Sequence, residues 1–269
     1  MTVRQERTQT NTRSGQVANR WLACPKPNPQ ASLRLFCFPY SGASASAFYA
    51  WANSLPPAIE VCPVELPGRG ARLTEPLCAQ LSSLVEAAAQ GLLPALDKPF
   101  ALFGHSMGAL VSFELARHLR RRYGVEPVHL FVSGHGAPQL PDEQAPIHAL
   151  PEAEFVARVR GLNGTPDEVW EHPELRDLLI PILRADFAMC ETYQFCPDEP
   201  LRHPISALAG LGDPYVSRGH MEGWREQTAG SFSVRMFPGD HFYLHTDRYL
   251  LLQTIARDLS SYLRNGGAA

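Results

Sequence analysis

Short apolar runs alternate with longer segments of helical periodicity over most of the chain. Six apolar runs have the length of strands: 33–38, 59–64, 100–103, 128–132, 205–211 and 232–237. Four segments repeat their apolar residues at helical spacing: 44–55, 77–96, 107–123 and 248–263. Short apolar strands that alternate with helices predict a mostly parallel sheet with helices on both faces.

The stretch at about 134–200 interrupts this alternation, because it contains no clear strand. Helical patches occur there instead, at 152–162 and 174–195, and Pro181 should kink or break the second of them. A segment of this length is not a plain loop. We therefore expect a helical insertion within the sheet domain.

Length and composition fit a single domain that carries this insertion. The chain has 269 residues and is 45% hydrophobic, which is enough for one sizeable core. Residues 1–20 are polar and aperiodic, so we expect a mobile tail there. The predicted domain then spans 21–263, and 264–269 form a short C-terminal tail.

Charge and cysteine usage argue against several classes of protein. A net charge of −3 without a clustered basic face gives no reason to expect nucleic acid. There is no run of roughly 18 apolar residues, so no membrane span is expected. The N-terminus lacks the apolar core of a secretory signal, which favours a cytoplasmic protein.

The cysteines and glycines indicate neither a disulfide framework nor a cofactor. Cys37 and Cys62 lie inside apolar runs, where we expect small buried side chains rather than bridges. No group of His, Cys, Asp and Glu has metal-ligand spacing, and no phosphate-binding loop occurs. We therefore expect neither a cofactor nor a metal.

The sequence Gly104-His105-Ser106-Met107-Gly108 carries the strongest chemical signal. It matches the nucleophile elbow G-x-S-x-G, in which a serine occupies a sharp turn between a strand and a helix. An apolar run precedes it and a helical segment follows it, as the elbow requires. The flanking glycines are needed because side chains there would collide with the strand and the helix. Ser106 is therefore the candidate nucleophile, and a glycine-rich loop with a capping serine is the alternative.

A serine nucleophile needs a base, and in this kind of fold the order along the chain is serine, acid, histidine. Five histidines follow the middle of the insertion: His172, His203, His220, His241 and His245. His241 fits best, because the turn Pro238-Gly239-Asp240 presents it directly after the last predicted strand. His245 would stand at the start of the last helix, where a polar residue needs no catalytic role.

The acid that orients the imidazole should end a strand. Asp213 follows the apolar run 205–211 and precedes Pro214. The other candidates lie in the insertion or beside the base: Asp142, Asp167, Asp177, Asp186, Asp198 and Asp240. Asp213 alone ends a predicted strand, although Asp-Pro also forms ordinary turns.

The reaction also needs donors for a negatively charged oxygen. One donor is the backbone N–H after the nucleophile, that of Met107, and the other comes from the loop after the first strand. That loop reads Pro39-Tyr40-Ser41-Gly42-Ala43, and its small residues let a substrate approach the backbone. The Ser41 N–H is the candidate; a turn of small residues that serves packing alone is the alternative.

At these positions the sequence resembles the type II thioesterases, the free-standing editing enzymes of polyketide and non-ribosomal peptide synthesis. The resemblance covers about 21–263 and rests on five stretches: 38–45 (FPYSGASA), 65–70 (ELPGRG), the elbow, 212–214 (GDP) with Val216, and 238–242 (PGDHF). The element at 65–70 is more specific than the elbow, which esterases and lipases share. The family loop commonly has Ala-Gly-Gly where this chain has Ser41-Gly42-Ala43.

The resemblance implies an α/β-hydrolase fold and hydrolysis of acyl or aminoacyl groups from phosphopantetheine-bearing carrier domains. Ser106, Asp213 and His241 would act through an acyl-enzyme, and the insertion at about 134–200 would be a lid over an acyl pocket. The partners would be acyl or peptidyl carrier domains and the acyl thioester, with the enzyme a monomer. A carboxylester hydrolase and a non-catalytic acyl-binding protein of the same fold are the alternatives.

Docking of a carrier is expected to involve basic side chains, because carriers in this setting are usually acidic. Arg69 and Arg72 follow a predicted strand on the side of the expected site. The phosphopantetheine arm of the carrier would reach the acyl pocket through a channel beside the lid. We therefore expect Arg69 and Arg72 at the mouth of this channel.

Overall fold

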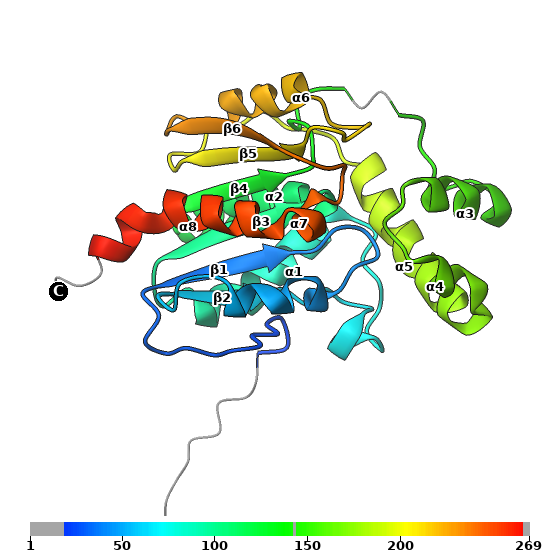
Figure 1. Cartoon of the computed structure of the whole chain (residues 1–269), viewed down its shortest axis with the longest axis horizontal. Coiled ribbons are helices and arrows are strands. Elements are labelled where there is room, and N and C mark those ends of the chain that lie inside the picture. The colour runs from blue at the N-terminus through cyan, green and yellow to red at the C-terminus, as the bar shows by residue number, and fades with distance from the viewer. Residues whose placement is uncertain (1–18, 142–143, 266–269) are drawn as a thin grey trace, which may run out of the picture.

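The computed structural model describes residues 19–141 and 144–265, which are arranged around one central sheet (Figure 1). Six strands of the described chain form it: β1 (Leu33–Phe38), β2 (Ile59–Pro63), β3 (Phe100–His105), β4 (His129–Ser133), β5 (Ile205–Gly210) and β6 (Phe232–Phe237). Every pairing among them is parallel, in the order β2-β1-β3-β4-β5-β6. The predicted parallel sheet is confirmed.

Helices cover both faces of the sheet. One face packs against α1 (Leu81–Leu92) and α2 (Met107–Tyr123), and the other against the 3₁₀ helix η1 (Ala45–Asn53) and α8 (Arg248–Asn265). Strand β1 shows why, because successive side chains of a strand point to opposite faces. Its phenylalanines enter the core under α1 and α2, whereas its two leucines and Cys37 enter the core under α8. In Figure 1, α8 crosses in front of the sheet.

Three helices lie between β4 and β5, and we call the segment that contains them the insertion. They are α3 (Glu152–Gly161), α4 (Asp167–Glu171) and α5 (Pro173–Glu191). Figure 1 places them on the side toward which the strand arrows point. They share a small core of their own, made of Ile147, Phe155, Val159, Trp170, Ile180 and Leu183. The insertion is therefore packed as a unit at the carboxyl ends of the strands.

Several local expectations differ from the structure. Helix α5 continues through Pro181 rather than breaking there, because the buried Ile180, Ile182 and Leu183 hold both sides of the proline in place. The helix expected from residue 77 begins at Leu81. Leu77 packs instead against the turn at Gly68, where an added Cβ would lie 2.3 Å from the leucine Cδ2.

Helix α4 of the insertion was not expected from the sequence. Five further short helices complete the described chain. They are η2 (Gly70–Arg72), η3 (Leu93–Ala95), α6 (Arg218–Glu222), η4 (Gly223–Gln227) and α7 (Tyr243–Thr246). Most of the expected N-terminal tail, residues 1–18, lies outside the described residues, as do residues 266–269. Among the helices described, none is long and apolar enough to cross a bilayer.

Candidate active site

Ser106 occupies the turn between β3 and α2, as the elbow predicts. Its backbone has φ 53° and ψ −121°, a conformation that non-glycine residues rarely adopt. The Ser106 N–H donates to the Ser133 carbonyl at 2.7 Å, which ties the turn to the end of β4. A Cβ at Gly104 would lie 1.9 Å from the Gly108 oxygen, and one at Gly108 would lie 2.2 Å from the Phe38 oxygen. Both glycines are therefore required for the turn.

Asp213 and His241 form a close pair on the loops after β5 and β6. The His241 Nδ1 donates to the Asp213 Oδ2 at 2.7 Å. The other carboxylate oxygen accepts the backbone N–H groups of Tyr215 at 2.9 Å and Val216 at 3.2 Å. The Asp213 side chain is fully buried, whereas that of His241 is 14% exposed. The carboxylate is thus fixed by three donors, and it orients the imidazole.

The alternatives for acid and base point elsewhere. Asp240 is exposed, and its Oδ1 accepts the N–H of Phe242 at 2.8 Å within its own turn. His245 lies in α7 rather than at the start of the last helix, and its Nε2 is 3.0 Å from the Tyr40 hydroxyl. Neither side chain has the contact that joins Asp213 to His241.

The end of β4 brings the serine and the histidine loops together. Gly134 follows the Ser133 carbonyl to which Ser106 bonds, and a Cβ there would lie 3.3 Å from the His241 Cε1. His105, next to the nucleophile, has its ring centroid 5.0 Å from that of His241. Burial holds the pKa of His105 well below its ordinary value, so this ring is neutral.

A buried ion pair connects the turn at 65–70, after β2, to the insertion. Both terminal nitrogens of Arg69 donate to the Asp186 carboxylate at 2.7 Å, and the side chains are 5% and 0% exposed. The same carboxylate accepts the Gly42 N–H at 2.8 Å, where Gly42 has φ +79°. Asp186 belongs to α5, so one carboxylate joins α5, the loop after β1 and the turn at 65–70.

The two backbone donors suggested by the sequence lie on the expected segments. Met107 is the first residue of α2, and N–H groups in the first turn of a helix have no intrahelical acceptor. Ser41 lies in the loop after β1, beside Gly42, whose own N–H is already used by Asp186. Their role as donors to a substrate oxygen stays a prediction.

Comparison with known families assigns the chain. A family profile described as "Thioesterase domain" matches residues 33–262, from the start of β1 into α8. The chain belongs to this thioesterase family. The matched region contains the elbow, Asp213 and His241, so the assignment covers the whole site described above.

Individual relatives of the thioesterase agree with the predicted resemblance. "Linear gramicidin dehydrogenase LgrE" of Brevibacillus parabrevis is 49% identical over 248 residues, covering 91% of this chain and 94% of the relative. The solved structure of RedJ, a thioesterase from the prodiginine pathway of Streptomyces coelicolor, shares 42% identity with a TM-score of 0.80, over 85% of this chain and 91% of RedJ. The type II thioesterase BorB of the borrelidin cluster shares 36% identity with a TM-score of 0.81, over 91% of this chain and 98% of BorB.

The sequence of this thioesterase lacks the usual signature of the dehydrogenase activity for which LgrE is named. A dinucleotide site of the common kind uses a G-x-G-x-x-G turn between a strand and a helix. This chain contains no such sequence, and its strand-to-helix turn after β3 is the serine elbow.

The expected docking role of Arg69 and Arg72 is wrong, because both side chains point into the thioesterase. The residues are only 4% and 6% exposed. Arg69 is held by Asp186, and Arg72 donates to Glu75 at 2.7 Å while its guanidinium lies 3.9 Å from the centre of the Trp21 ring. Their positive charges are therefore compensated inside the protein and are not presented to a partner.

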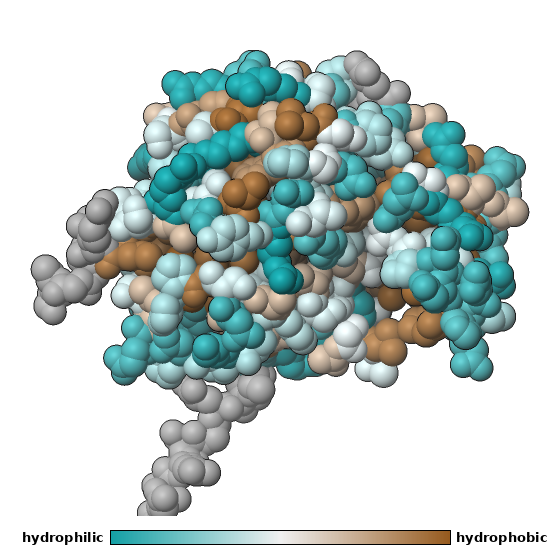
Figure 2. All heavy atoms as spheres, viewed as in Figure 1, coloured by the Kyte–Doolittle hydropathy of each residue, from teal (hydrophilic) through white to brown (hydrophobic). Residues whose placement is uncertain are grey.

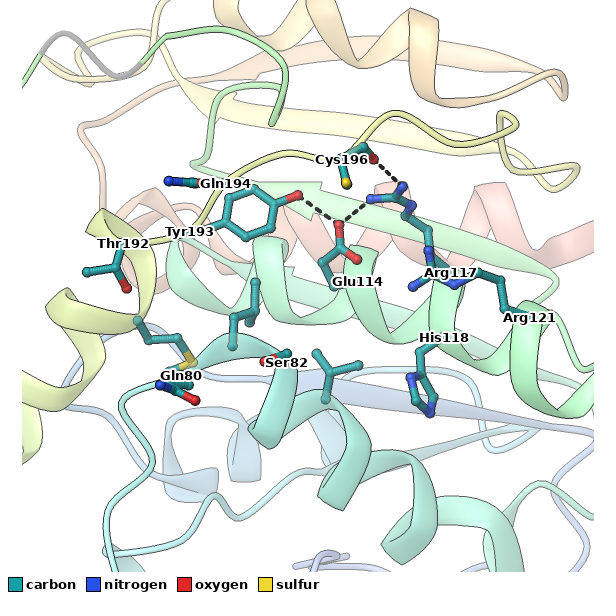
Figure 3. Close-up of a pocket in the computed structure, with 13 residues that line it drawn as sticks. Gln80, Ser82, Glu114, Arg117, His118, Arg121, Thr192, Tyr193, Gln194 and Cys196 are labelled. Atoms are coloured by element: carbon teal, nitrogen blue, oxygen red, sulfur yellow. Dashed lines mark hydrogen bonds and ion pairs between the residues drawn. The ribbon is translucent and has the colours of Figure 1, made fainter.

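A hollow of about 580 Å³ opens between α1, α2 and the segment after α5, away from the site (Figure 3). Two hydrogen bonds join residues that line it: Tyr193 donates to Glu114 at 2.7 Å, and Arg117 donates to the same carboxylate oxygen at 2.5 Å. Its lining contains none of the proposed catalytic residues, and Glu114 lies two helical turns beyond Ser106 along α2. We therefore do not place the substrate in this hollow.

Proposed function

We propose that this thioesterase hydrolyses acyl and aminoacyl groups from the phosphopantetheine arms of carrier domains, as a monomer in the cytoplasm. It would thereby clear stalled or misprimed chains from a synthase. The observations that support this most are the 2.7 Å contact between Asp213 and His241 and the strained backbone of Ser106 at the elbow. The solved relative BorB bears the name type II thioesterase, which favours the same class of substrate.

In the proposed reaction the Ser106 hydroxyl attacks the thioester carbonyl, and His241 takes its proton. Asp213 holds the ring by its Nδ1 and stabilises the charge that the ring gains. The N–H groups of Met107 and Ser41 bind the negatively charged oxygen. The C–S bond then breaks, the thiol leaves with the proton from His241, and the acyl group remains on Ser106. A water activated by His241 hydrolyses this ester, so the cycle needs no cofactor and no metal.

The insertion is the proposed lid and acyl-binding surface. Helix α5 rests on the loop after β1, since a Cβ at Gly42 would lie 2.7 Å from the Leu183 Cδ2 and 3.4 Å from the Leu179 Cδ1. Leu175 and Leu178 on the same helix are 46% and 47% exposed. Figure 2 shows hydrophobic surface at the junction of the insertion with the body of the molecule. Apolar surface on the insertion suits an acyl chain and excludes water.

A comparison of substrates that carry the same acyl group tests the proposal. We expect kcat/KM to be highest for the acyl-carrier protein, lower for acyl-CoA, and lowest for an oxygen ester, with Ser106→Ala inactive on all three. Equal values for the carrier and for CoA would contradict the role of the carrier domain. A preference for the oxygen ester would instead support a carboxylester hydrolase.

A further inference from the structure

A short N-terminal segment covers the outer edge of the sheet. Residues 21–24 run antiparallel to the end of β2, which is the edge strand, and Leu22 forms a bridge with Val64. In an antiparallel pair the residue numbers increase along one segment while those of the opposite residues decrease. Two residues beyond Leu22, Cys24 therefore stands opposite Cys62 of β2.

The backbone hydrogen bonds that would normally flank this cysteine pair in an antiparallel ladder cannot form. The Ala23 N–H donates to the Pro63 carbonyl at 3.0 Å. The two bonds that would flank the pair of Cys24 and Cys62 require the N–H groups of residues 25 and 63. Both residues are prolines, which have no N–H to donate. The segment is thus left without backbone bonds at the point where the two cysteines meet.

The two sulfur atoms are close enough to react after a small side-chain rotation. They lie within 4.8 Å of each other, and both are free thiols. A pair at this kind of antiparallel position has its Cα atoms about 4.5 Å apart, which falls in the range of about 4.4–6.8 Å found for disulfides. Cys24 is partly exposed, whereas Cys62 is fully buried.

We propose that Cys24 and Cys62 form a reversible disulfide that clamps residues 21–24 to the edge of the sheet. A small-molecule disulfide such as oxidised glutathione is the oxidant. The Cys24 thiolate attacks it and releases one thiolate, which leaves a mixed disulfide on Cys24. Cys62 then loses its proton and attacks the Cys24 sulfur, which releases the second thiol. Two protein thiols are oxidised to one disulfide, and one disulfide is reduced to two thiols.

The surroundings assign the two roles. A hydrogen bond to the Cys62 thiol is the main cause that lowers the pKa of Cys24, with a smaller contribution from Arg34. The same hydrogen bond, together with burial, raises the pKa of Cys62. Cys24 is partly exposed and Cys62 is fully buried, so the oxidant reaches Cys24 first, and Cys62 then resolves the mixed disulfide.

A metal ion fits this cluster less well, although Glu60 brings a carboxylate near both sulfurs. Its Oε1 accepts the Asn28 N–H at 2.9 Å, and its Oε2 accepts from the Arg34 Nε at 2.7 Å. Both oxygens are thus in use, and the positive charge of Arg34 lies against the same carboxylate, where it would repel a cation. The geometry favours a bond between two sulfurs over coordination.

The test uses the full-length protein, reduced first and then incubated with oxidised glutathione. We expect a mass lower by about 2 Da, the two hydrogens lost in forming one bridge, and a Cys24–Cys62 linked peptide in a non-reducing digest. The melting temperature should rise by about 5–10 °C, and dithiothreitol should reverse all three changes.

Matched variants make the result specific. Cys24→Ser should lose the bridge and the rise in melting temperature, and Cys78→Ser, which alters another partly exposed thiol, should keep both. Glutathione that stays on Cys24, or a bridge from Cys24 to Cys37, would overturn the proposal. One Zn²⁺ per chain that survives gel filtration and protects Cys24 from oxidation would overturn it in favour of a metal site.

Discussion

The loops that carry Ser106, Asp213 and His241 differ from the insertion in how they are held. Ser106 and Asp213 follow the buried strands β3 and β5, and His241 follows the edge strand β6 of the same parallel sheet. Backbone hydrogen bonds tie the ends of β3, β4 and β5 together. The insertion has its own small core and is joined to the loop after β1 through Asp186 of α5. Groups that must be placed within a fraction of an ångström thus lie on the rigid sheet, and the proposed acyl surface lies on a separately packed unit.

This contrast predicts that substitutions in the two regions fail in different ways. Changes at the strand-end loops should abolish chemistry in a folded protein. Changes at Asp186, which connects the insertion to the loop after β1, should lower the free energy of unfolding more than they lower kcat.

Ser106→Ala should lower kcat by about 10⁴- to 10⁶-fold, because the nucleophile is lost. The hydroxyl is partly exposed, so its removal leaves no large cavity, and the urea midpoint should stay unchanged. Steady-state thioester hydrolysis and a urea titration measure the two quantities. A folded alanine variant with near-normal activity would disprove the role of this serine.

Asp213→Asn should lower kcat by about 10³- to 10⁴-fold, because the amide no longer holds His241 in the required tautomer. Asp240→Asn is the matched control, and it should change kcat by less than about threefold because Asp240 bonds only within its own turn. Steady-state kinetics on one thioester compares the two variants. If the two effects were reversed, the acid would have been misassigned.

Asp186→Asn should lower the free energy of unfolding by about 3–5 kcal/mol, because Arg69 would be left as a buried charge without its partner. Glu222→Gln is the control in the exposed pair with Arg218, and it should cost less than about 1 kcal/mol. Urea unfolding measures both.

A double variant sharpens this test. Arg69→Met with Asp186→Leu removes both charges, so it should be more stable than Asp186→Asn alone. The folded fraction of Asp186→Asn should keep far more activity than Asp213→Asn. An Asp186→Asn loss no larger than that of the surface control would show that the buried ion pair does not hold the insertion in place.

His129, the first residue of β4, should make the free energy of unfolding depend on pH. Burial lowers its folded-state pKa to about 4, whereas the ordinary value is about 6.5. Between these values the unfolded chain binds a proton that the folded protein does not, so stability falls as the pH decreases. This group alone should account for about 2 kcal/mol between pH 7 and pH 5.

His129→Gln isolates that contribution. Urea unfolding at both pH values should show a smaller loss in the variant than in the natural protein. An equal loss in both proteins would mean that other groups are responsible.

Local patterns were sufficient for the sheet and for the nucleophile. The bounds of β1, α2 and β6 could be read from the sequence, because apolar runs and a helix-ending glycine mark them directly. The order serine, acid, histidine was enough to select Asp213 and His241, which the structure brings together.

Long-range partners were beyond such patterns. Arg69 looked like a surface cation because Asp186, 117 residues away, is invisible in the local sequence. For the same reason Asp186 was only one of several unassigned carboxylates. Cys24 lies in none of the elements predicted from the sequence, so its pairing with Cys62 could not be foreseen until the antiparallel bridge at Leu22 was known.

The position of β6 at the rim of the sheet has a consequence for the timing of reactivity. In the described sheet β6 is paired on one side only, with β5, and the proposed base that follows β6 lies about half of the chain after Ser106. A nascent or partly opened molecule that has β3 and α2 in place but not β6 would carry a serine no more reactive than any other hydroxyl. Fraying of a single rim strand, which costs less than global unfolding, would switch hydrolysis off while the rest of the sheet stays folded. In the proposed mechanism, activity would therefore require that this last strand is paired with β5.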